Sequence, residues 1–159
     1  MEFDLSKPQK LLQKSARDLF ARTCPAKKVR ALMATDTALD AELWSAVADQ
    51  GWLGIHLSEA HGGLGLGIVD LAVVAEEMGR CCYPGPFLGT VWAATLIAEA
   101  NPASKYLQSF TAGESKGAVA FLESDASWDL SGVRLQAKQS GKSYQLTGRK
   151  SFVSDAGRS

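Results

Sequence analysis

Cysteine and histidine are scarce in this chain of 159 residues, which contains three cysteines and two histidines. Cys24, Cys81 and Cys82 are odd in number and two of them are adjacent, so they form neither a disulfide framework nor a CxxC pair for zinc or redox chemistry. No cysteine or histidine cluster surrounds His56 or His61. We therefore expect no metal site, and thiols kept reduced in a cytoplasmic protein.

The chain also lacks an excess of charge of either sign and a long apolar run. Seventeen Lys and Arg balance 17 Asp and Glu, so no overall field attracts nucleic acid or anionic lipid. The longest uncharged stretch, residues 81–98, contains Pro84 and Pro86. Its helical remainder of about 15 residues would span ~22 Å, less than the ~30 Å hydrocarbon layer. We expect a soluble protein without nucleic-acid or membrane partners.

What the chain does contain is apolar residues at helical spacing over its first two thirds. Ser6 is a candidate helix cap, Asp40 another, and Pro25, Gly51 and Gly113 are stop signals. These signals predict six helices: after Ser6 to before Pro25, a short one around 29–33, after Asp40 to before Gly51, about 68–80, about 87–100, and one around 106–110.

Beyond Glu114 the pattern changes to strands. Candidate strands are the runs 117–122, 133–137, 144–146 and 150–153, with a hairpin-type turn at 140–142. The predicted fold class is therefore mainly α: a bundle of about six helices in residues 1–114, followed by a few β-strands in residues 115–159. Three or four strands form a marginal sheet with unpaired edges. On this basis we expect the chain to be cut short.

Four local features allow two interpretations each. The glycine-rich loop 61–67 favours a tight connection between helices over a phosphate site, because no strand leads into it. Glu76 and Glu77 point about 100° apart on a helix, so one solvated and one half-buried carboxylate is expected rather than a catalytic pair. The four tryptophans are expected in the core or at a domain seam. The apolar helix 87–100 is either a core helix or the wall of a tunnel for an aliphatic ligand.

Three segments together resemble the acyl-CoA dehydrogenase family. They are Leu43–Gly54, His61–Arg80 with its sequence HGGLGLG followed by VDLAVVAEEMGR, and Tyr144–Val153 with its sequence YQLTGRKSFV. The start of the chain, with Ser6 followed by QKLL, is similar as well. The resemblance extends over the whole chain in the order and spacing of the family.

The resemblance implies a helical N-terminal domain, a middle β-barrel domain that is incomplete here, and a C-terminal four-helix domain. It implies FAD as cofactor and an acyl-CoA substrate that is desaturated between Cα and Cβ. The catalytic carboxylate of the family belongs to the C-terminal domain, so no catalytic residue is expected in this chain. The expected partners are the remaining domains of a parent chain and the subunits of a homo- or hetero-oligomer.

The resemblance also implies site residues. Phe152 and Ser154 match family positions against the flavin, and Glu123 matches the acidic residue of the flavin loop. Leu122 replaces the threonine of that loop, and the glycines and serines that follow are missing, so weak or atypical FAD binding is expected. If an acyl chain binds, it is expected along the face of the helix 87–100 that carries the residues Phe87, Thr90, Val91 and Ala94.

Two alternatives stay open. A non-catalytic subunit of a heteromeric dehydrogenase would tolerate a degenerate flavin loop. A helical interaction module could share the bundle without the chemistry. Binding of flavin distinguishes the dehydrogenase from both alternatives.

Overall fold

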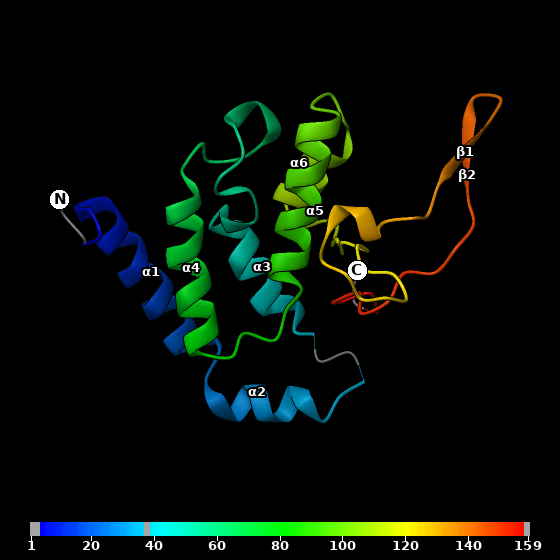
Figure 1. Ribbon diagram of the computed structural model, residues 1–159. Helices are drawn as coiled ribbons and strands as arrows, with labels where there is room; N and C mark the ends of the chain where they lie inside the picture. The colour runs from blue at the N-terminus through cyan, green and yellow to red at the C-terminus, as the bar shows by residue number, and fades with distance from the viewer. Residues whose placement is uncertain (1–3, 37–38, 158–159) are drawn as a thin grey trace.

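The computed structural model describes residues 4–36 and 39–157, which contain six α-helices, three short 3-10 helices and one two-stranded sheet (Figure 1). The α-helices are α1 Lys7–Thr23, α2 Ala26–Met33, α3 Ala41–Asp49, α4 Ile68–Arg80, α5 Phe87–Ala100 and α6 Tyr106–Thr111. The 3-10 helices are η1 Trp52–Gly54, η2 Glu59–His61 and η3 Leu130–Gly132. The expected helix order and the mainly α fold class are confirmed.

The helix caps act as expected from the sequence. Ser6 and Gln9 form a capping box at the start of α1, in which the Gln9 side chain accepts from the Ser6 N–H at 3.0 Å. The Asp40 carboxylate accepts from the Leu43 N–H at 2.7 Å and caps α3. After α6, Gly113 adopts φ +75°, and a Cβ atom there would lie 2.6 Å from that of Ala48. Only glycine satisfies both demands.

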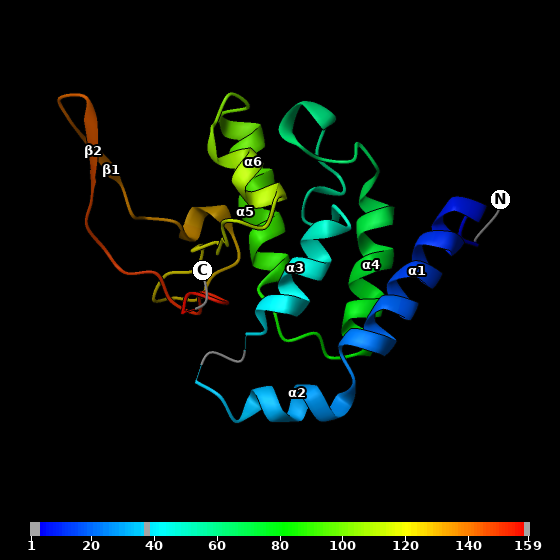
Figure 2. The same cartoon turned by 180° about the vertical axis from the view of Figure 1, so that it is seen from behind.

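The helices pack around one apolar core. α1 packs against α4, and α5 packs against α6, while α2 crosses one end of the bundle in both Figure 1 and Figure 2. At the centre, the ring of Phe20 lies 5.7 Å from that of Trp52 and 5.8 Å from that of Tyr83. The core therefore joins α1 to η1 and to the segment after α4. No helix in the described ranges is both long enough and apolar enough to span a bilayer.

The glycine-rich loop is the tight connection that the sequence predicts. The N–H groups of Leu64 and Leu66 donate to the carbonyls of Gly54 and Ile55. A Cβ atom on Gly63 would lie 2.2 Å from the Leu57 carbonyl oxygen, so the two backbones meet directly there. These N–H groups of the loop therefore donate to carbonyls of the same chain, as expected of a structural connection.

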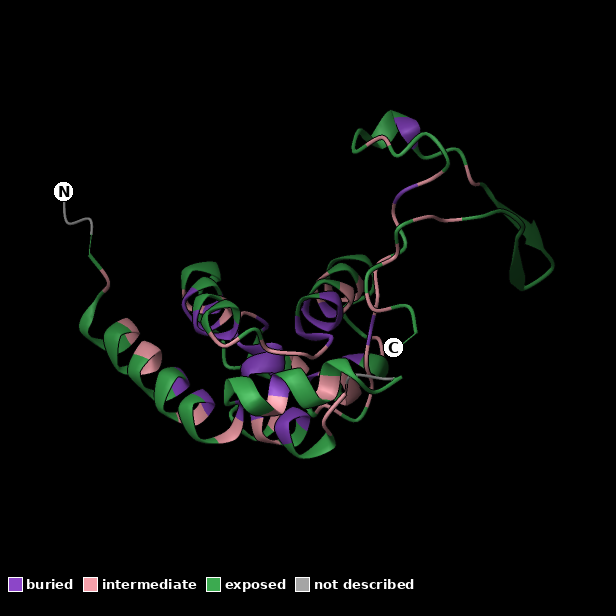
Figure 3. Cartoon of the chain, turned by 90° about the horizontal axis from the view of Figure 1, so that it is seen from below, coloured by how far each residue is buried: buried purple, intermediate pink, exposed green. Residues whose placement is uncertain are grey.

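The β segment differs from the sequence prediction. Its antiparallel pair is β1 Ala137–Ser140 with β2 Ser143–Leu146, and Gly141 at φ +61° forms the turn. Every residue of both strands is exposed, and the hairpin projects away from the helices (Figure 3). Of the three or four strands expected, the described residues pair only these two. The runs 117–122 and 150–153 are joined by one backbone bond, from Ser151 N–H to Leu122 C=O at 2.8 Å, which does not make a ladder.

Candidate functional site

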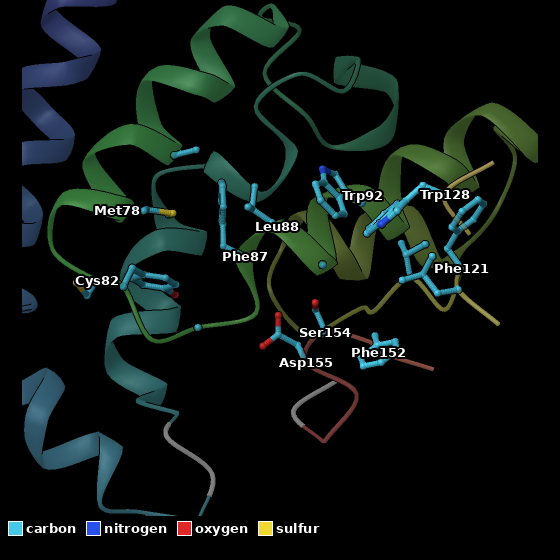
Figure 4. Close-up of a pocket in the computed structure, with 17 residues that line it drawn as sticks. Met78, Cys82, Phe87, Leu88, Trp92, Phe121, Trp128, Phe152, Ser154 and Asp155 are labelled. Atoms are coloured by element: carbon cyan, nitrogen blue, oxygen red, sulfur yellow. The ribbon is translucent and has the colours of Figure 1, made fainter. Parts of the chain in front are cut away.

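A cavity of about 690 Å³ lies between the helices α4 and α5 and the segment after α6 (Figure 4). Met78 and Cys82 lie at its α4 end, and Phe121, Trp128 and Phe152 lie at the other end. The lining is completed by Ala75, Gly79, Tyr83, Gly85, Phe87, Leu88, Gly89, Trp92, Val119, Leu122, Ser154 and Asp155. The walls are thus mostly apolar, as in most small-molecule sites.

Aromatic side chains form the wall far from α4. The rings of Phe121 and Trp128 stack with centroids 6.2 Å apart, and Trp92 of α5 lies beside them (Figure 4). Trp128 is 78% exposed and Phe152 80% exposed. Large aromatic surfaces left in water around a cavity indicate a binding site, because burying them would be favourable.

The polar groups of the cavity are few. Ser154 and Asp155 lie between its two ends (Figure 4), and burial raises the pKa of Tyr83, so its phenol stays neutral. Among the described lining residues there is neither lysine nor arginine. The site therefore suits a ligand that is mainly apolar where it enters the cavity.

Three of the four residues predicted for the flavin line this cavity. They are Leu122, Phe152 and Ser154. Glu123 does not line it. Its Oε1 atom instead accepts from Lys150 Nζ at 2.8 Å and from the N–H groups of residues 134 and 135 at 3.1 and 2.9 Å.

Glu123 thus connects three stretches of the C-terminal segment. The hydrogen bond from Lys150 is the main reason that the pKa of this carboxyl lies below its usual value. Lys150 Nζ also donates to the Phe121 carbonyl at 3.1 Å. The pair positions the cavity wall near Phe121 and Leu122 rather than entering the cavity.

The residues predicted for an acyl chain are divided. Phe87 lines the cavity. Thr90, Val91 and Ala94 are fully buried on another face of α5, where Val91 belongs to the core cluster and the Thr90 hydroxyl accepts from the Gly117 N–H at 3.0 Å. The structure therefore does not bring these three residues together with Phe87 at the cavity.

Most of the cavity wall was not predicted from the sequence. On α5 the residues that face it are Leu88, Gly89 and Trp92, and on α4 they are Ala75, Met78 and Gly79. In the folded chain Leu88 and Trp92 stay 45% and 54% exposed, but no local pattern marks them beforehand. Because α5 is apolar on all sides, its sequence gave no preference between this face and the core face.

The four tryptophans divide between the core and the seam where the helices meet the segment after α6. Trp44 and Trp52 are buried in the core, and Trp44 Nε1 donates to the Gly113 carbonyl at 2.7 Å. Trp92 and Trp128 are exposed at the cavity, on the two sides of this seam. Large aromatic side chains gain much from burial, so their exposed surfaces are suited to contact a ligand.

Glu77 is more deeply buried than predicted. Its side chain is 1% exposed and accepts from Arg17 Nη2 at 2.7 Å and Nε at 3.1 Å, and from Arg80 Nε at 3.0 Å. The bond to Arg17 is the main cause of the lowered pKa of this carboxyl. Glu76 is solvated, as expected. The pair is not a catalytic dyad, since Glu77 anchors α1 to α4.

The cavity fits part of a flavin. Its aromatic walls and the Ser154 hydroxyl suit a flat ring that is apolar on its faces and polar at its edge. The same lining offers no cation to a pyrophosphate. The lining of the cavity is therefore compatible with a flavin ring and not with the phosphates of FAD.

Comparison with known proteins gives a consistent result. A family profile described as "Acyl-CoA dehydrogenase, N-terminal domain" matches residues 6–114. The mitochondrial long-chain specific acyl-CoA dehydrogenase of Mus musculus is 37% identical over 119 residues, which are 72% of this chain and 28% of the mouse protein.

Solved structures agree with the sequence comparison. The Tcur3481–Tcur3483 steroid ACAD superposes with a TM-score of 0.79 at 31% identity, covering 92% of this chain and 41% of that one. PigA with FAD and proline superposes with a TM-score of 0.81 at 26% identity, covering 98% of this chain and 42% of that one. This chain thus spans less than half the length of each of these relatives.

Proposed function

The chain belongs to the acyl-CoA dehydrogenase family, and we propose that it is the N-terminal part of an FAD-dependent oxidoreductase that desaturates an acyl-CoA thioester. In this proposal its cavity between α4, α5 and the segment 119–155 holds the acyl group and contacts the flavin ring. The observation that carries the proposal is the convergence of Leu122, Phe152 and Ser154, chosen from the sequence as flavin positions, on one apolar cavity.

Different residues of this chain would contact the flavin ring and the acyl group. Ser154 offers a hydroxyl to the polar edge of the ring, and Phe152 with Trp128 offers flat apolar surface. Leu88 and Trp92 on α5 would cover the acyl group and exclude water from it. FAD, when bound, supplies the acceptor for a hydride. These residues orient the two reactants rather than move a proton.

The rest of the machinery would come from outside this chain. Leu96, an exposed apolar residue of α5 outside the cavity, and the exposed hairpin β1–β2 are surfaces on which further domains or subunits would pack. We propose that these domains supply the base and the cations for the phosphates, within a homo- or hetero-oligomer. One relative of known structure is a steroid ACAD, and a bulky acyl group is compatible with the size of the cavity.

One observation favours the alternative of a non-catalytic subunit. Leu122 is 7% exposed and presents a hydrocarbon side chain to the cavity at the position where the family has a hydroxyl. If Leu122 has taken over the volume that a flavin edge would need, the cavity binds an apolar ligand and no flavin.

Flavin titration separates the two candidates. We expect the wild-type chain to quench riboflavin fluorescence weakly, Leu122→Thr to strengthen binding because it restores a hydroxyl, and Ser154→Ala to weaken it several-fold. FAD should bind no more tightly than riboflavin, since no lining cation meets the phosphates. The flavin proposal would be contradicted if neither substitution changed the affinity for riboflavin. It would also be contradicted if neither wild type nor Leu122→Thr bound riboflavin.

A further inference from the structure

Gly79 stands in the last turn of α4 and lines the cavity next to Met78. Its φ is not in the left-handed region, so the backbone does not require glycine. A Cβ atom built there meets no heavy atom within 4 Å beyond its own helix backbone and chain neighbours. Neither the turn nor the packing of the protein therefore explains a glycine at this position.

Other glycines of the fold have a visible reason. A Cβ atom on Gly63 would lie 2.2 Å from a carbonyl oxygen, and one on Gly113 would lie 2.6 Å from the Cβ of Ala48. Glycine within a helix costs stability relative to alanine. Gly79 is exposed and lines the cavity, so its missing side chain leaves open space at the cavity wall.

The surroundings of this space are mainly apolar, and the Cys82 thiol is a weak polar group at the same end of the cavity. Met78 and Phe87 are almost fully buried beside it, while the polar groups Ser154 and Asp155 lie toward the middle of the cavity (Figure 4). Met78 and Phe87 offer no hydrogen bond to a ligand group next to Gly79. A hydrocarbon group therefore fits there without leaving a buried polar group unpaired.

We propose that Gly79 determines how bulky an apolar group the α4 end of the cavity admits, and that ring-bearing or branched acyl ends are accommodated there. The inference rests on the proposed function, because it takes the cavity as the acyl site. Gly79 would act as a specificity-determining residue: a larger side chain at this position fills the space of the ligand without touching the protein core.

The test measures binding to the 159-residue chain through the fluorescence of Trp92 and Trp128. The probes are butyryl-CoA, decanoyl-CoA and cyclohexanebutyryl-CoA, and the variants are Gly79→Ala, Gly79→Leu and Ala72→Leu. Ala72 is an exposed residue of the same helix that does not line the cavity, so it controls for added bulk and helix propensity.

We expect Gly79→Leu, which adds four carbon atoms, to weaken binding of the ring-ended probe at least about tenfold, since a misfit of even one methylene in an apolar pocket has that effect. The affinity of Gly79→Leu for butyryl-CoA should differ from that of wild type by less than twofold. For the ring-ended probe, the affinity of Gly79→Ala should lie between those of wild type and Gly79→Leu, and that of Ala72→Leu should match wild type. Thermal unfolding checks that each variant is folded, and Gly79→Ala should melt above wild type.

Two results would overturn the inference in different ways. If the probes bind and Gly79→Leu weakens all three equally or none of them, Gly79 does not select among acyl groups while the acyl site stands. If no probe binds to any folded variant, the proposed acyl site fails and the role of Gly79 fails with it.

Discussion

Glu77 is a carboxylate that the fold removes almost completely from water, and two half-exposed arginines hold it. Arg17 binds it from α1 and Arg80 from its own helix. Removing Glu77 leaves both guanidinium groups without this partner, whereas Glu76 is 62% exposed and lies 4.0 Å from Arg80.

We expect Glu77→Ala to lower the free energy of unfolding by about 2 kcal/mol at pH 7, as hydrogen bonds to charged groups do. Glu76→Ala should change it by less than about 0.5 kcal/mol. Urea unfolding of both variants measures the difference. Equal effects would show that the bonds of Glu77 do not anchor α1 to α4.

His56 is a half-buried polar residue whose bonding predicts a measurable effect. The Thr95 hydroxyl donates to the Val91 carbonyl at 2.7 Å, so it must accept from His56 Nε2, which lies 2.7 Å away. Nδ1 then carries a buried lone pair without a partner among the described residues. Burial lowers the pKa of this imidazole, because a charge there would lack water.

This lowered pKa makes the stability depend on pH. The unfolded chain takes up a proton on His56 at a pH of about 6.5, while the folded chain does so only at lower pH. The unfolded state therefore binds more protons, and the free energy of unfolding falls as the pH is lowered from 7 through this range. We expect His56→Gln to flatten the fall between pH 7 and 5.5, measured by urea unfolding.

Carboxylates do not obscure this window. Hydrogen bonds from Arg17 and Lys28 lower the pKa values of Glu77 and Asp40 respectively, against the opposing effect of burial. Their stabilisation is present above the unfolded pKa of about 4 and is lost only as the pH falls through the lower folded values. An unchanged slope above pH 5.5 in His56→Gln would contradict the role of His56.

At the scale of elements, the hairpin β1–β2 contrasts with the helices. All eight of its strand positions are exposed, and within the described ranges its two strands pair only with each other. An isolated two-stranded hairpin is marginal in water, since it buries too little apolar surface to offset the entropy of ordering.

We therefore expect trypsin to cut the hairpin before the helices. Lys138 lies in β1 and Lys142 in the turn. Trypsin should cleave after both lysines while α1 to α6 remain intact, and mass spectrometry of the early fragments would record this order. Amides of β1 and β2 should also exchange faster than those around Val74 in the core. Simultaneous cleavage in the helices and the hairpin would show that the hairpin is as stable as the bundle.

At the scale of the whole molecule, the cavity has the apolar walls of a binding site and few groups that could accept a proton from a substrate. Asp155 is the one carboxylate among the described residues that line it, and the catalytic carboxylate that the family resemblance implies belongs to another domain. Removing a proton from Cα requires a base within hydrogen-bond reach.

We expect this chain, supplied with FAD and an acyl-CoA, to show no dehydrogenation above the protein-free rate with an electron-accepting dye. The measurement includes Asp155→Asn as a matched variant. Dye reduction by wild type that Asp155→Asn abolishes would identify Asp155 as the base and contradict the prediction. Reduction that survives this substitution would also place a base within the chain, at another residue.

Much of the secondary structure was predictable because its determinants are local. The Ser6–Gln9 capping box, the Asp40 cap and the turn at Gly141 each act within a few residues. The predicted strands at 117–122 and 150–153 failed because a strand needs a partner, and the single bond between Ser151 and Leu122 does not provide one.

The cavity was predictable only in part. Leu122, Phe152 and Ser154 were found because family resemblance fixes positions in sequence. Its α4 wall, with Met78 and Gly79, was missed because nothing in the local pattern distinguishes a residue that faces a cavity from one that faces solvent or core.

By itself the sequence determined six helices, their caps and the hairpin turn, since backbone bonds and apolar periodicity act between near neighbours along the chain. The tertiary structure alone decided which face of α5 meets the cavity, because a helix that is apolar all round is turned only by what packs against it. It also decided that Arg17 meets Glu77. Such contacts join residues far apart in sequence, and only the path of the folded chain brings them within reach.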